Sequence, residues 1–181
     1  KAEKEDMVVI DAPDSILKCT NKIYLHDLMI SKRLPIPRTE ILYRDDPKKM
    51  EESSARLGFP LVLKIPDGSF SRGIVKVESA EKLKAAADAL FQHTALILAQ
   101  EFMFTEFDWR IGVLNREPLY ACKYYMSRGH WQIYNHGAKG RAKSGGFETL
   151  PVREAPPDVV KLALKATSPI GDGLYGVDIK K

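Results

Sequence analysis

Cysteine is scarce in this chain, since only Cys19 and Cys122 occur among its 181 residues. Two distant cysteines fit none of the spacings at which zinc is held, and they are too few for the disulfide framework of a small secreted domain. The simpler interpretation is a reduced, intracellular setting. We therefore expect a cytoplasmic protein.

Long apolar runs are also absent. No stretch approaches the ~20 residues needed to cross a bilayer, so we expect no membrane partner. The N-terminal residues, Lys-Ala-Glu-Lys-Glu-Asp, lack the apolar core of a signal peptide. The chain begins without Met and stops at Lys180-Lys181, directly after a strand-like run. We expect it to be an excised piece of a longer protein.

Charge of one sign is not strongly in excess. The chain has 28 basic and 24 acidic side chains, a net charge of +4, and the two kinds are mixed along it. This pattern gives little support to a nucleic-acid surface, although local anion sites stay open. With 44% hydrophobic residues the composition is that of a soluble globular protein large enough to bury a core.

A P-loop is missing, yet one stretch looks suited to phosphate. The apolar run 61–63 leads into Lys64 and then into a loop with Gly68, Ser69, Ser71, Arg72 and Gly73. A P-loop enters a helix, whereas Ile74–Val77 is rich in β-branched residues and favours a strand. Glycine lets the backbone approach an anion, and Lys64 and Arg72 add charge. The stretch is either an ordinary hairpin with a long turn or a hairpin flap that covers phosphate.

The patterning predicts an α+β fold. We expect a helix to about residue 30 capped by Thr20, and further helices over 47–57, 79–91 and 157–167. We expect strands over 39–43, 61–63, 74–77, 96–99, 107–114, 119–126, 131–134 and 175–179, with 96–99 continuing directly into residues 100–103. Residues 1–19 read as a tail or linker, and residues 135–146 as a loop long enough to be functional.

Several charged residues lie in unusual places. Lys22 falls in the first turn of a helix, where the dipole favours anions, so it is either a solvated lysine or a ligand for an anion. Glu101 lies in an apolar run and needs a polar partner. Asp108 and Arg110 share one strand face, opposite Trp109. They form either a surface ion pair or part of a site.

Taken together, ordered pieces of the chain resemble the ATP-grasp fold and, more narrowly, the RimK-type carboxylate–amine ligases. These pieces are Thr20-Asn21-Lys22, Val62-Leu63-Lys64, Gly68–Gly73, Gln100-Glu101-Phe102, Asp108-Trp109-Arg110 and Gly171–Asp178. The resemblance covers about residues 20–181. It implies two α+β lobes with an ATP site between them, and an activity in which ATP phosphorylates a carboxylate and an amine then displaces phosphate to form an amide.

The resemblance also implies roles for individual residues. Lys22, Lys64 and the loop residues Gly68, Ser69, Arg72 and Gly73 would hold phosphates. The hinge Gln100, Glu101, Phe102 and Met103 would bind adenine, with a plain core strand as the alternative. Asp108 and Asn135 would contact the nucleotide, Arg110 would stabilise the transferring phosphoryl group, and Asp178 would bind Mg²⁺ or Mn²⁺, with two further metal ligands expected downstream.

The expected organisation follows from the same resemblance. Residues 20–98 would form the N-terminal lobe, and residues 99–181 a C-terminal lobe that is incomplete at its end. His136, Lys139, Arg141 and Lys143 either receive an acidic substrate or lie in a solvated loop. The partners would be a nucleotide and a carboxylate and an amine, each a small molecule or a peptide, with an amino acid such as glutamate among the candidates. A second copy of the chain, in a homo-oligomer, is a further candidate partner. A non-catalytic nucleotide-binding or partner-binding module is the alternative.

Overall fold

The computed structural model describes residues 2–68, 73–135 and 137–181. The chain divides into two compact units. One consists of Thr20–Phe104, and the other combines Lys1–Cys19 with Thr105–Lys181. We call them the central unit and the terminal unit, because the second contains both ends of the chain. The lobe boundaries expected at residues 19 and 98 stay predictions.

The central unit begins with helix α2, and its helix ends follow local capping chemistry. The Asn21 side chain caps α2 (Lys22–Ser31) by accepting hydrogen bonds from the backbone amides of Ile23 and Tyr24, so the cap predicted at Thr20 is wrong by one residue. Asp46 caps α3 (Pro47–Leu57) through the Lys49 amide, as Asp-Pro pairs favour. Gly58 ends α3 with a φ of 77°, a conformation that costs glycine little.

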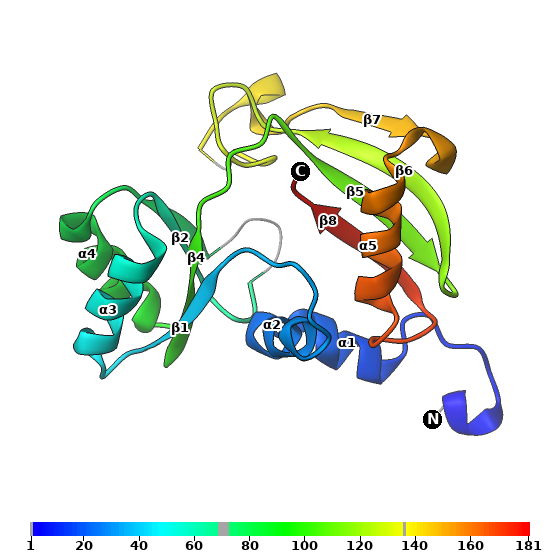
Figure 1. The fold of residues 1–181 in the computed structure, drawn as a ribbon, viewed down its shortest axis with the longest axis horizontal. Helices are drawn as coiled ribbons and strands as arrows, with labels where there is room; N and C mark the ends of the chain where they lie inside the picture. Colours follow the sequence, from blue (N-terminus) through cyan, green and yellow to red (C-terminus); the bar gives the residue numbers. More distant parts are fainter. Residues whose placement is uncertain (1, 69–72, 136) are drawn as a thin grey trace. The chain divides into compact units, whose positions relative to one another are not determined.

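A four-stranded antiparallel sheet forms the centre of this unit. Its strands are β1 (Thr39–Tyr43), β2 (Leu61–Lys64), β3 (Ile74–Val77) and β4 (Leu96–Glu101), in the order β1-β4-β2-β3. Helices α3 and α4 (Ala80–Phe91) cover one face (Figure 1). Leu61, Leu63 and Val77 point into the core beneath them. The expected hairpin is confirmed, and Lys64 pairs with Ile74 where its loop begins.

Strand β3 offers a matched test of this core. Val77 is 1% exposed and packs in the core, whereas Val75, two residues earlier, is 36% exposed. We expect Val77→Ala to lower the free energy of unfolding by about 2 kcal/mol, because burial of a valine side chain contributes roughly that amount. Val75→Ala should have a much smaller effect. Urea unfolding of both variants measures the difference, and equal losses would contradict the assigned core face.

The terminal unit holds a second antiparallel sheet. Its strands are β5 (Phe107–Leu114), β6 (Glu117–Tyr125), β7 (Phe147–Leu150) and β8 (Leu174–Ile179), in the order β7-β6-β5-β8. Helix α5 (Pro157–Thr167) packs on one face, over Trp109 and Ile111 (Figure 1). Asp108 and Arg110 therefore lie on the opposite face, as the alternation predicts.

Two parts of this unit differ from expectation. Where a tail was predicted, the short helix α1 (Pro13–Thr20) forms, after the 3₁₀ turn η1 (Ala2–Glu5). The Ser15 hydroxyl lies 2.8 Å from the Tyr175 hydroxyl, and Lys18 donates to the Ile170 carbonyl at 3.2 Å. These long-range bonds join α1 to the end of the chain, which local sequence patterns cannot reveal.

The strand predicted over residues 131–134 is wrong. The chain there consists of bends, with one isolated bridge between Tyr134 and Ser144. The strand that pairs with β6 is instead β7, which the sequence analysis missed. Two 3₁₀ turns, η2 (Gly140–Lys143) and η3 (Val152–Glu154), flank it. Gly145 lies so close to the backbone of Tyr125 that any larger residue would clash.

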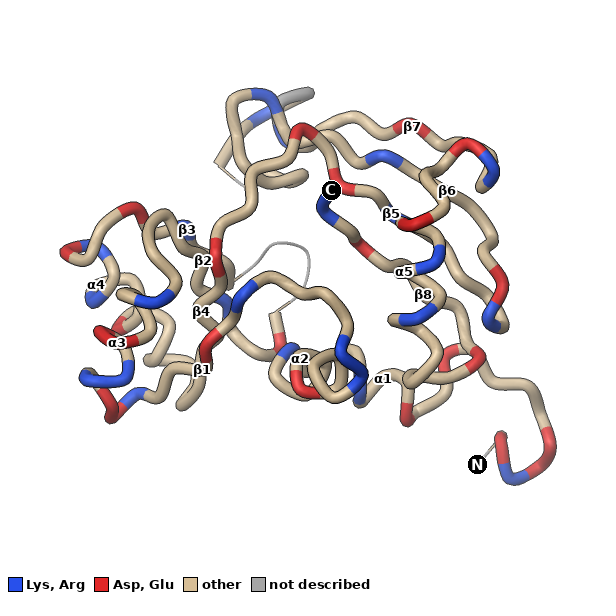
Figure 2. The backbone as a smooth tube through the Cα atoms, in the orientation of Figure 1, with Lys and Arg blue, Asp and Glu red and all other residues tan. Residues whose placement is uncertain are grey.

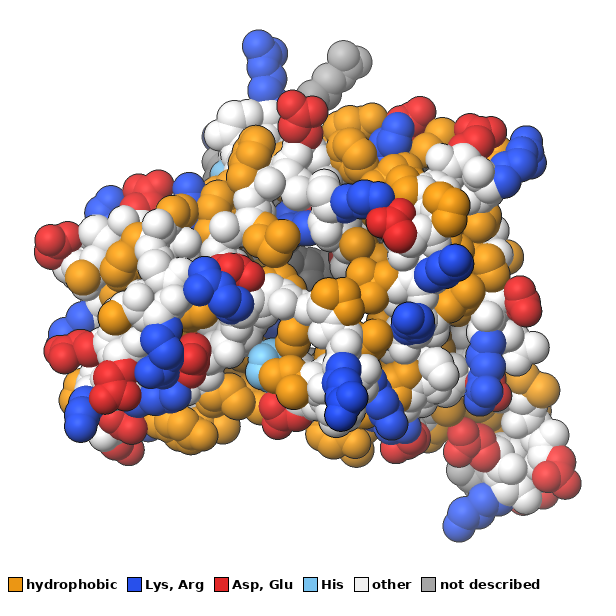
Figure 3. Space-filling model, viewed as in Figure 1, with side chains coloured by type: hydrophobic (Ala, Val, Ile, Leu, Met, Phe, Trp, Pro, Cys, Tyr) orange, Lys and Arg blue, Asp and Glu red, His pale blue; other side chains and the backbone are white. Residues whose placement is uncertain are grey.

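Charges of both signs are interspersed on the surface. Figure 2 shows both acidic and basic residues on α3 and α4, where pairs such as Lys48–Glu52 and Lys84–Asp88 form one helical turn apart. The face in Figure 3 has the same mixture. Within residues 2–68, 73–135 and 137–181, no helix has the length and apolarity that a membrane span requires.

Candidate functional site

A chain of side-chain hydrogen bonds crosses the central sheet on the face opposite its core. Lys64, at the end of β2, donates from Nζ to Oε1 of Gln100 at 2.6 Å. Gln100 Nε2 donates to the Thr39 hydroxyl at 2.8 Å, and that hydroxyl donates to the Pro37 carbonyl at 2.8 Å. Strand alternation places Lys64 here, because Leu61 and Leu63 point to the core.

Lys22 connects helix α2 to the start of the hairpin loop. Its backbone amide donates to the Pro66 carbonyl at 3.0 Å, and its ammonium group donates to the Pro66 and Gly68 carbonyls. Partial burial lowers the pKa of Lys22, and the nearby Asp67 carboxylate opposes that shift. Two predicted phosphate ligands, Lys22 and Lys64, therefore bracket the segment that enters the loop.

Part of the predicted clamp lies outside the described residues, namely Ser69, Ser71 and Arg72. Gly73, at the far end of the loop, has a φ of 65°, and a Cβ atom there would lie 2.4 Å from the Ile65 side chain. A larger residue would be strained by this φ and would displace the Ile65 side chain. Gly73 therefore has a role in the geometry of the hairpin, whatever the hairpin binds.

The predicted adenine hinge lies at the end of β4. Gln100 and Glu101 belong to the strand, and Phe102 and Met103 follow it. Glu101 accepts hydrogen bonds from the backbone and the guanidinium of Arg38 at 2.7 and 2.8 Å, which lower its pKa. This confirms that the carboxylate has a polar partner. The Lys76 ammonium lies 4.5 Å from the centroid of the Phe102 ring.

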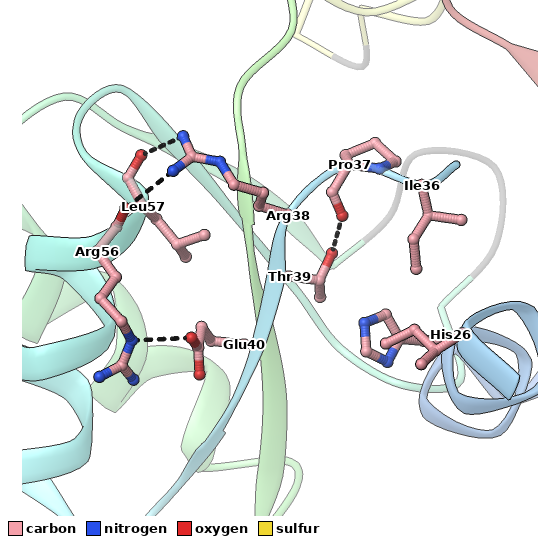
Figure 4. Close-up of a pocket in the computed structure, with 9 residues that line it drawn as sticks. His26, Ile36, Pro37, Arg38, Thr39, Glu40, Arg56 and Leu57 are labelled. Carbon is pink, nitrogen blue, oxygen red and sulfur yellow. Dashed lines mark hydrogen bonds and ion pairs between the residues drawn. The ribbon is translucent and has the colours of Figure 1, made fainter. Parts of the chain in front are cut away.

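A cavity of about 540 Å³ opens beside β1, and it contains none of the predicted site residues. It is lined by residues from α2, the segment that precedes β1, β1 itself and the end of α3: His26, Ile30, Ile36, Pro37, Arg38, Thr39, Glu40, Arg56 and Leu57 (Figure 4). Arg38 donates to the carbonyls of Arg56 and Leu57 at 3.0 and 3.3 Å and so closes the end of α3. Thr39 links the cavity wall to Gln100.

We expect Glu40, in the wall of this cavity, to make the stability of the fold depend on pH. Hydrogen bonds from Arg56 and Lys49, at 3.0 and 2.9 Å, lower the pKa of Glu40 in the folded state. Its stabilising contribution is complete above the ordinary glutamate pKa of about 4.3 and is lost as the pH falls through the lower folded value. We expect Glu40→Gln to flatten the dependence of stability on pH below about pH 5. The exposed Glu51→Gln is the control, and equal curves for both variants would contradict the assignment.

Arg110 and Asp178 form an ion pair on the face of the terminal sheet opposite α5. They are direct neighbours across β5 and β8, and the guanidinium makes two hydrogen bonds to the carboxylate, at 2.6 and 2.7 Å. The guanidinium also lies 4.6 Å from the centroid of the Tyr124 ring. These contacts raise the pKa of Arg110, with Asp178 as the largest cause. Arg110 is therefore fixed in place and permanently charged.

Asp108 has a different partner from the one considered in the sequence analysis. It accepts hydrogen bonds from Lys180 and from the Thr105 hydroxyl, both at 2.7 Å. The alternative of an Asp108–Arg110 ion pair is therefore wrong. Arg110 pairs with Asp178 in β8, and Asp108 pairs with Lys180 directly after β8. Lys180 was missed, although the alternation after Asp178 places it on the same face.

Asn135 lies at the start of the long loop. Its side-chain oxygen accepts from the Gly137 amide at 3.1 Å, and its backbone amide donates to the Lys143 carbonyl at 2.9 Å. Lys139 and Lys143 are exposed. His136 and the side chain of Arg141 lie outside the described residues. The roles predicted for this loop stay predictions.

The residues present fit a nucleotide better than a metal ion. Lys22, Lys64 and the glycine-rich hairpin are suited to phosphate oxygens. In the described part of the chain, by contrast, no three His, Cys, Asp or Glu residues form a group that could hold a metal. Asp178 has both oxygens on Arg110. The described residues therefore do not make a magnesium site by themselves.

Comparison with known proteins identifies the family. Residues 28–169 match the family model described as D-ala D-ala ligase C-terminus. The alpha-aminoadipate–LysW ligase LysX of Sulfolobus acidocaldarius is 27% identical over 176 residues, which is 94% of this chain and 59% of LysX. This chain thus spans well under two thirds of the length of that relative.

Solved structures agree on the fold. D-alanine–D-alanine ligase from Bacillus anthracis complexed with ATP has a TM-score of 0.75 at 18% identity, over 99% of this chain and 58% of that one. The RimK domain protein ATP-grasp from Sphaerobacter thermophilus has a TM-score of 0.72 at 16% identity, over 99% and 61%. The chain therefore belongs to the D-ala D-ala ligase C-terminus family, and its α+β fold is the ATP-grasp fold.

Proposed function

We propose that the full-length product of the gene encoding this chain is an ATP-dependent, RimK-like carboxylate–amine ligase, and that this chain supplies its nucleotide-binding residues. The observation that carries the proposal is the pair of lysines at the base of the β2–β3 hairpin. Lys22 reaches the carbonyls of Pro66 and Gly68, and Lys64 stands at the start of the same segment. Two cations beside a glycine-rich flap suit a polyphosphate.

The remaining site residues take roles around that centre. Gly68, Ser69, Arg72 and Gly73 cover the phosphates from the hairpin. Gln100, Glu101, Phe102 and Met103 hold adenine, largely through the backbone after β4. Asp108 and Asn135 are the further residues that we propose as nucleotide ligands. Asp178 would contribute one oxygen ligand to Mg²⁺, or to Mn²⁺ in its place, and within the described residues no three His, Cys, Asp or Glu side chains form a group that could hold the metal.

The proposed reaction is the one that the resemblance to carboxylate–amine ligases implies. An oxygen of the substrate carboxylate attacks the γ-phosphorus of ATP, ADP leaves, and an acyl phosphate forms. The amine then attacks the acyl carbon, phosphate leaves with the carboxylate oxygen, and the amine nitrogen loses a proton. Arg110 faces the charge that develops on the phosphoryl oxygens, a role suited to its rigid fork of donors.

The substrate class is a carboxylate and an amine, with an amino acid such as glutamate or a peptide as candidates. LysX, by its name, joins α-aminoadipate to LysW. The exposed Lys139 and Lys143, with His136 and Arg141 beside them in the sequence, suit an acidic substrate. We propose this loop as the part of the site that receives it.

One observation favours a second candidate. Asp178 is engaged by Arg110, and the described residues contain no metal-binding cluster. A non-catalytic module that binds nucleotide or a partner would need no complete metal site. Residues that supply metal ligands elsewhere in the full-length gene product would favour the ligase.

The test is a phosphate-release assay of the full-length gene product with Mg-ATP and a panel of carboxylate and amine pairs. We expect release that depends on both substrates for one pair, with the amide detected by mass spectrometry. Nucleotide binding without release for any pair would favour the non-catalytic module. Failure to bind nucleotide at all would contradict the ligase and the nucleotide-binding module, and would leave only a module that binds a partner.

A further inference from the structure

Gln100 occupies a position from which its side chain reaches two other strands. It lies on β4 between β1 and β2, directly opposite Thr39 on one side and Val62 on the other. Lys64, two residues beyond Val62, is its diagonal neighbour on the same face. We propose that Gln100 is a positioning residue that holds the Lys64 ammonium group ready for the phosphates of ATP. This inference rests on the proposed function.

The direction of the hydrogen-bond chain is fixed from its far end. The Pro37 carbonyl can only accept, so the Thr39 hydroxyl must donate to it. The lone pairs of that hydroxyl then accept from the Gln100 amide nitrogen, at 2.8 Å. This leaves the amide oxygen of Gln100 facing Lys64, at 2.6 Å. The flip state of Gln100, and with it the acceptor offered to Lys64, follows from the fold.

A neutral acceptor suits this task better than a carboxylate. Lysine is a point charge on a flexible four-carbon stem, so an acceptor at its tip reduces the freedom that it loses when phosphate binds. An amide oxygen orients the ammonium group without neutralising it. Glu101, the adjacent carboxylate, is held instead by Arg38. Negative charge is thereby kept off the proposed phosphate ligand.

The experiment compares ATP with adenosine, because only ATP carries phosphates. In the full-length gene product, Gln100→Met keeps the length of the side chain and removes both of its hydrogen bonds. We expect it to weaken ATP binding about tenfold, the loss associated with one charge-assisted hydrogen bond, and to change adenosine binding less than about twofold. Gln92→Met, on the exposed end of α4, is the matched control and should change neither.

Two further variants separate positioning from structure. Gln100→Glu should also weaken the binding of ATP relative to that of adenosine, because the new carboxylate competes with phosphate for Lys64. In a Lys64→Met background, Gln100→Met should not weaken ATP binding any further, since Gln100 acts through Lys64. The inference is overturned if Gln100→Met weakens the binding of ATP and of adenosine equally, or if its effect on ATP binding adds fully to that of Lys64→Met. A wild-type protein that binds no ATP would instead overturn the proposed function, and the inference with it.

Discussion

Replacing Arg110 with methionine is expected to lower the kcat of the ligation by about 10²–10³-fold, the usual cost of removing a donor aimed at developing charge. The guanidinium is already positioned by Asp178 and by the Tyr124 ring. It therefore needs little reorganisation when the phosphoryl oxygens gain charge. Steady-state phosphate release by the full-length gene product, with its preferred substrate pair, measures the loss.

The matched control for this variant is Arg116→Met. Arg116 lies at the β5–β6 turn, is 63% exposed and pairs with Asp172. Its replacement should leave kcat within about twofold, because an exposed ion pair contributes little. Arg110→Lys should recover only part of the activity, since an ammonium group cannot reproduce two parallel hydrogen bonds to one group. An Arg110→Met enzyme with wild-type kcat would contradict the role proposed for Arg110.

Replacing Lys64 with methionine should remove most of the stabilisation that Mg-ATP gives to the protein. A ligand that binds only the folded state at 100 times its Kd stabilises that state by about 2.7 kcal/mol, and the melting temperature rises accordingly. Without the Lys64 ammonium group the phosphates lose a direct charged partner, so the same nucleotide concentration should give little or no rise. Thermal melts with and without Mg-ATP measure this.

The control for Lys64 is Lys84→Met. Lys84 is 71% exposed on α4, where it pairs with Asp88 one helical turn away. Its loss should leave the ATP-induced rise unchanged, because it lies on the helical side of the central sheet. A Lys64→Met protein that keeps the full rise would show that the hairpin does not hold phosphate.

The elements that the sequence predicts well are those with local signals. Asp46-Pro47 and Gly58 define α3, and the alternation around Trp109 defines the faces of β5. The missed elements depend on distant partners. Helix α1 is joined to Tyr175, 160 residues from Ser15, and β7 is defined by its pairing with β6. A local pattern does not contain pairings between residues so far apart in the chain.

The candidate site shows the same limit. Resemblance to a family pointed to Gln100 for its place in the hinge, but its side chain bonds Thr39 and Lys64, which are 61 and 36 residues away. The sequence also suggested pairing Asp108 with Arg110, because they are close along one strand. Across the sheet, however, Asp108 pairs with Lys180 and Arg110 pairs with Asp178. Partners on a sheet are set by register, which the sequence of one strand does not contain.

The central claim is that this chain supplies a nucleotide site built around Lys22, Lys64 and the β2–β3 hairpin. The most direct test is calorimetric titration of the full-length gene product with a non-hydrolysable ATP analogue and Mg²⁺. We predict one saturable site per chain that is lost in Lys64→Met and retained in Lys84→Met. Absence of saturable binding to the wild-type protein, or equal binding by both variants, would contradict the claim.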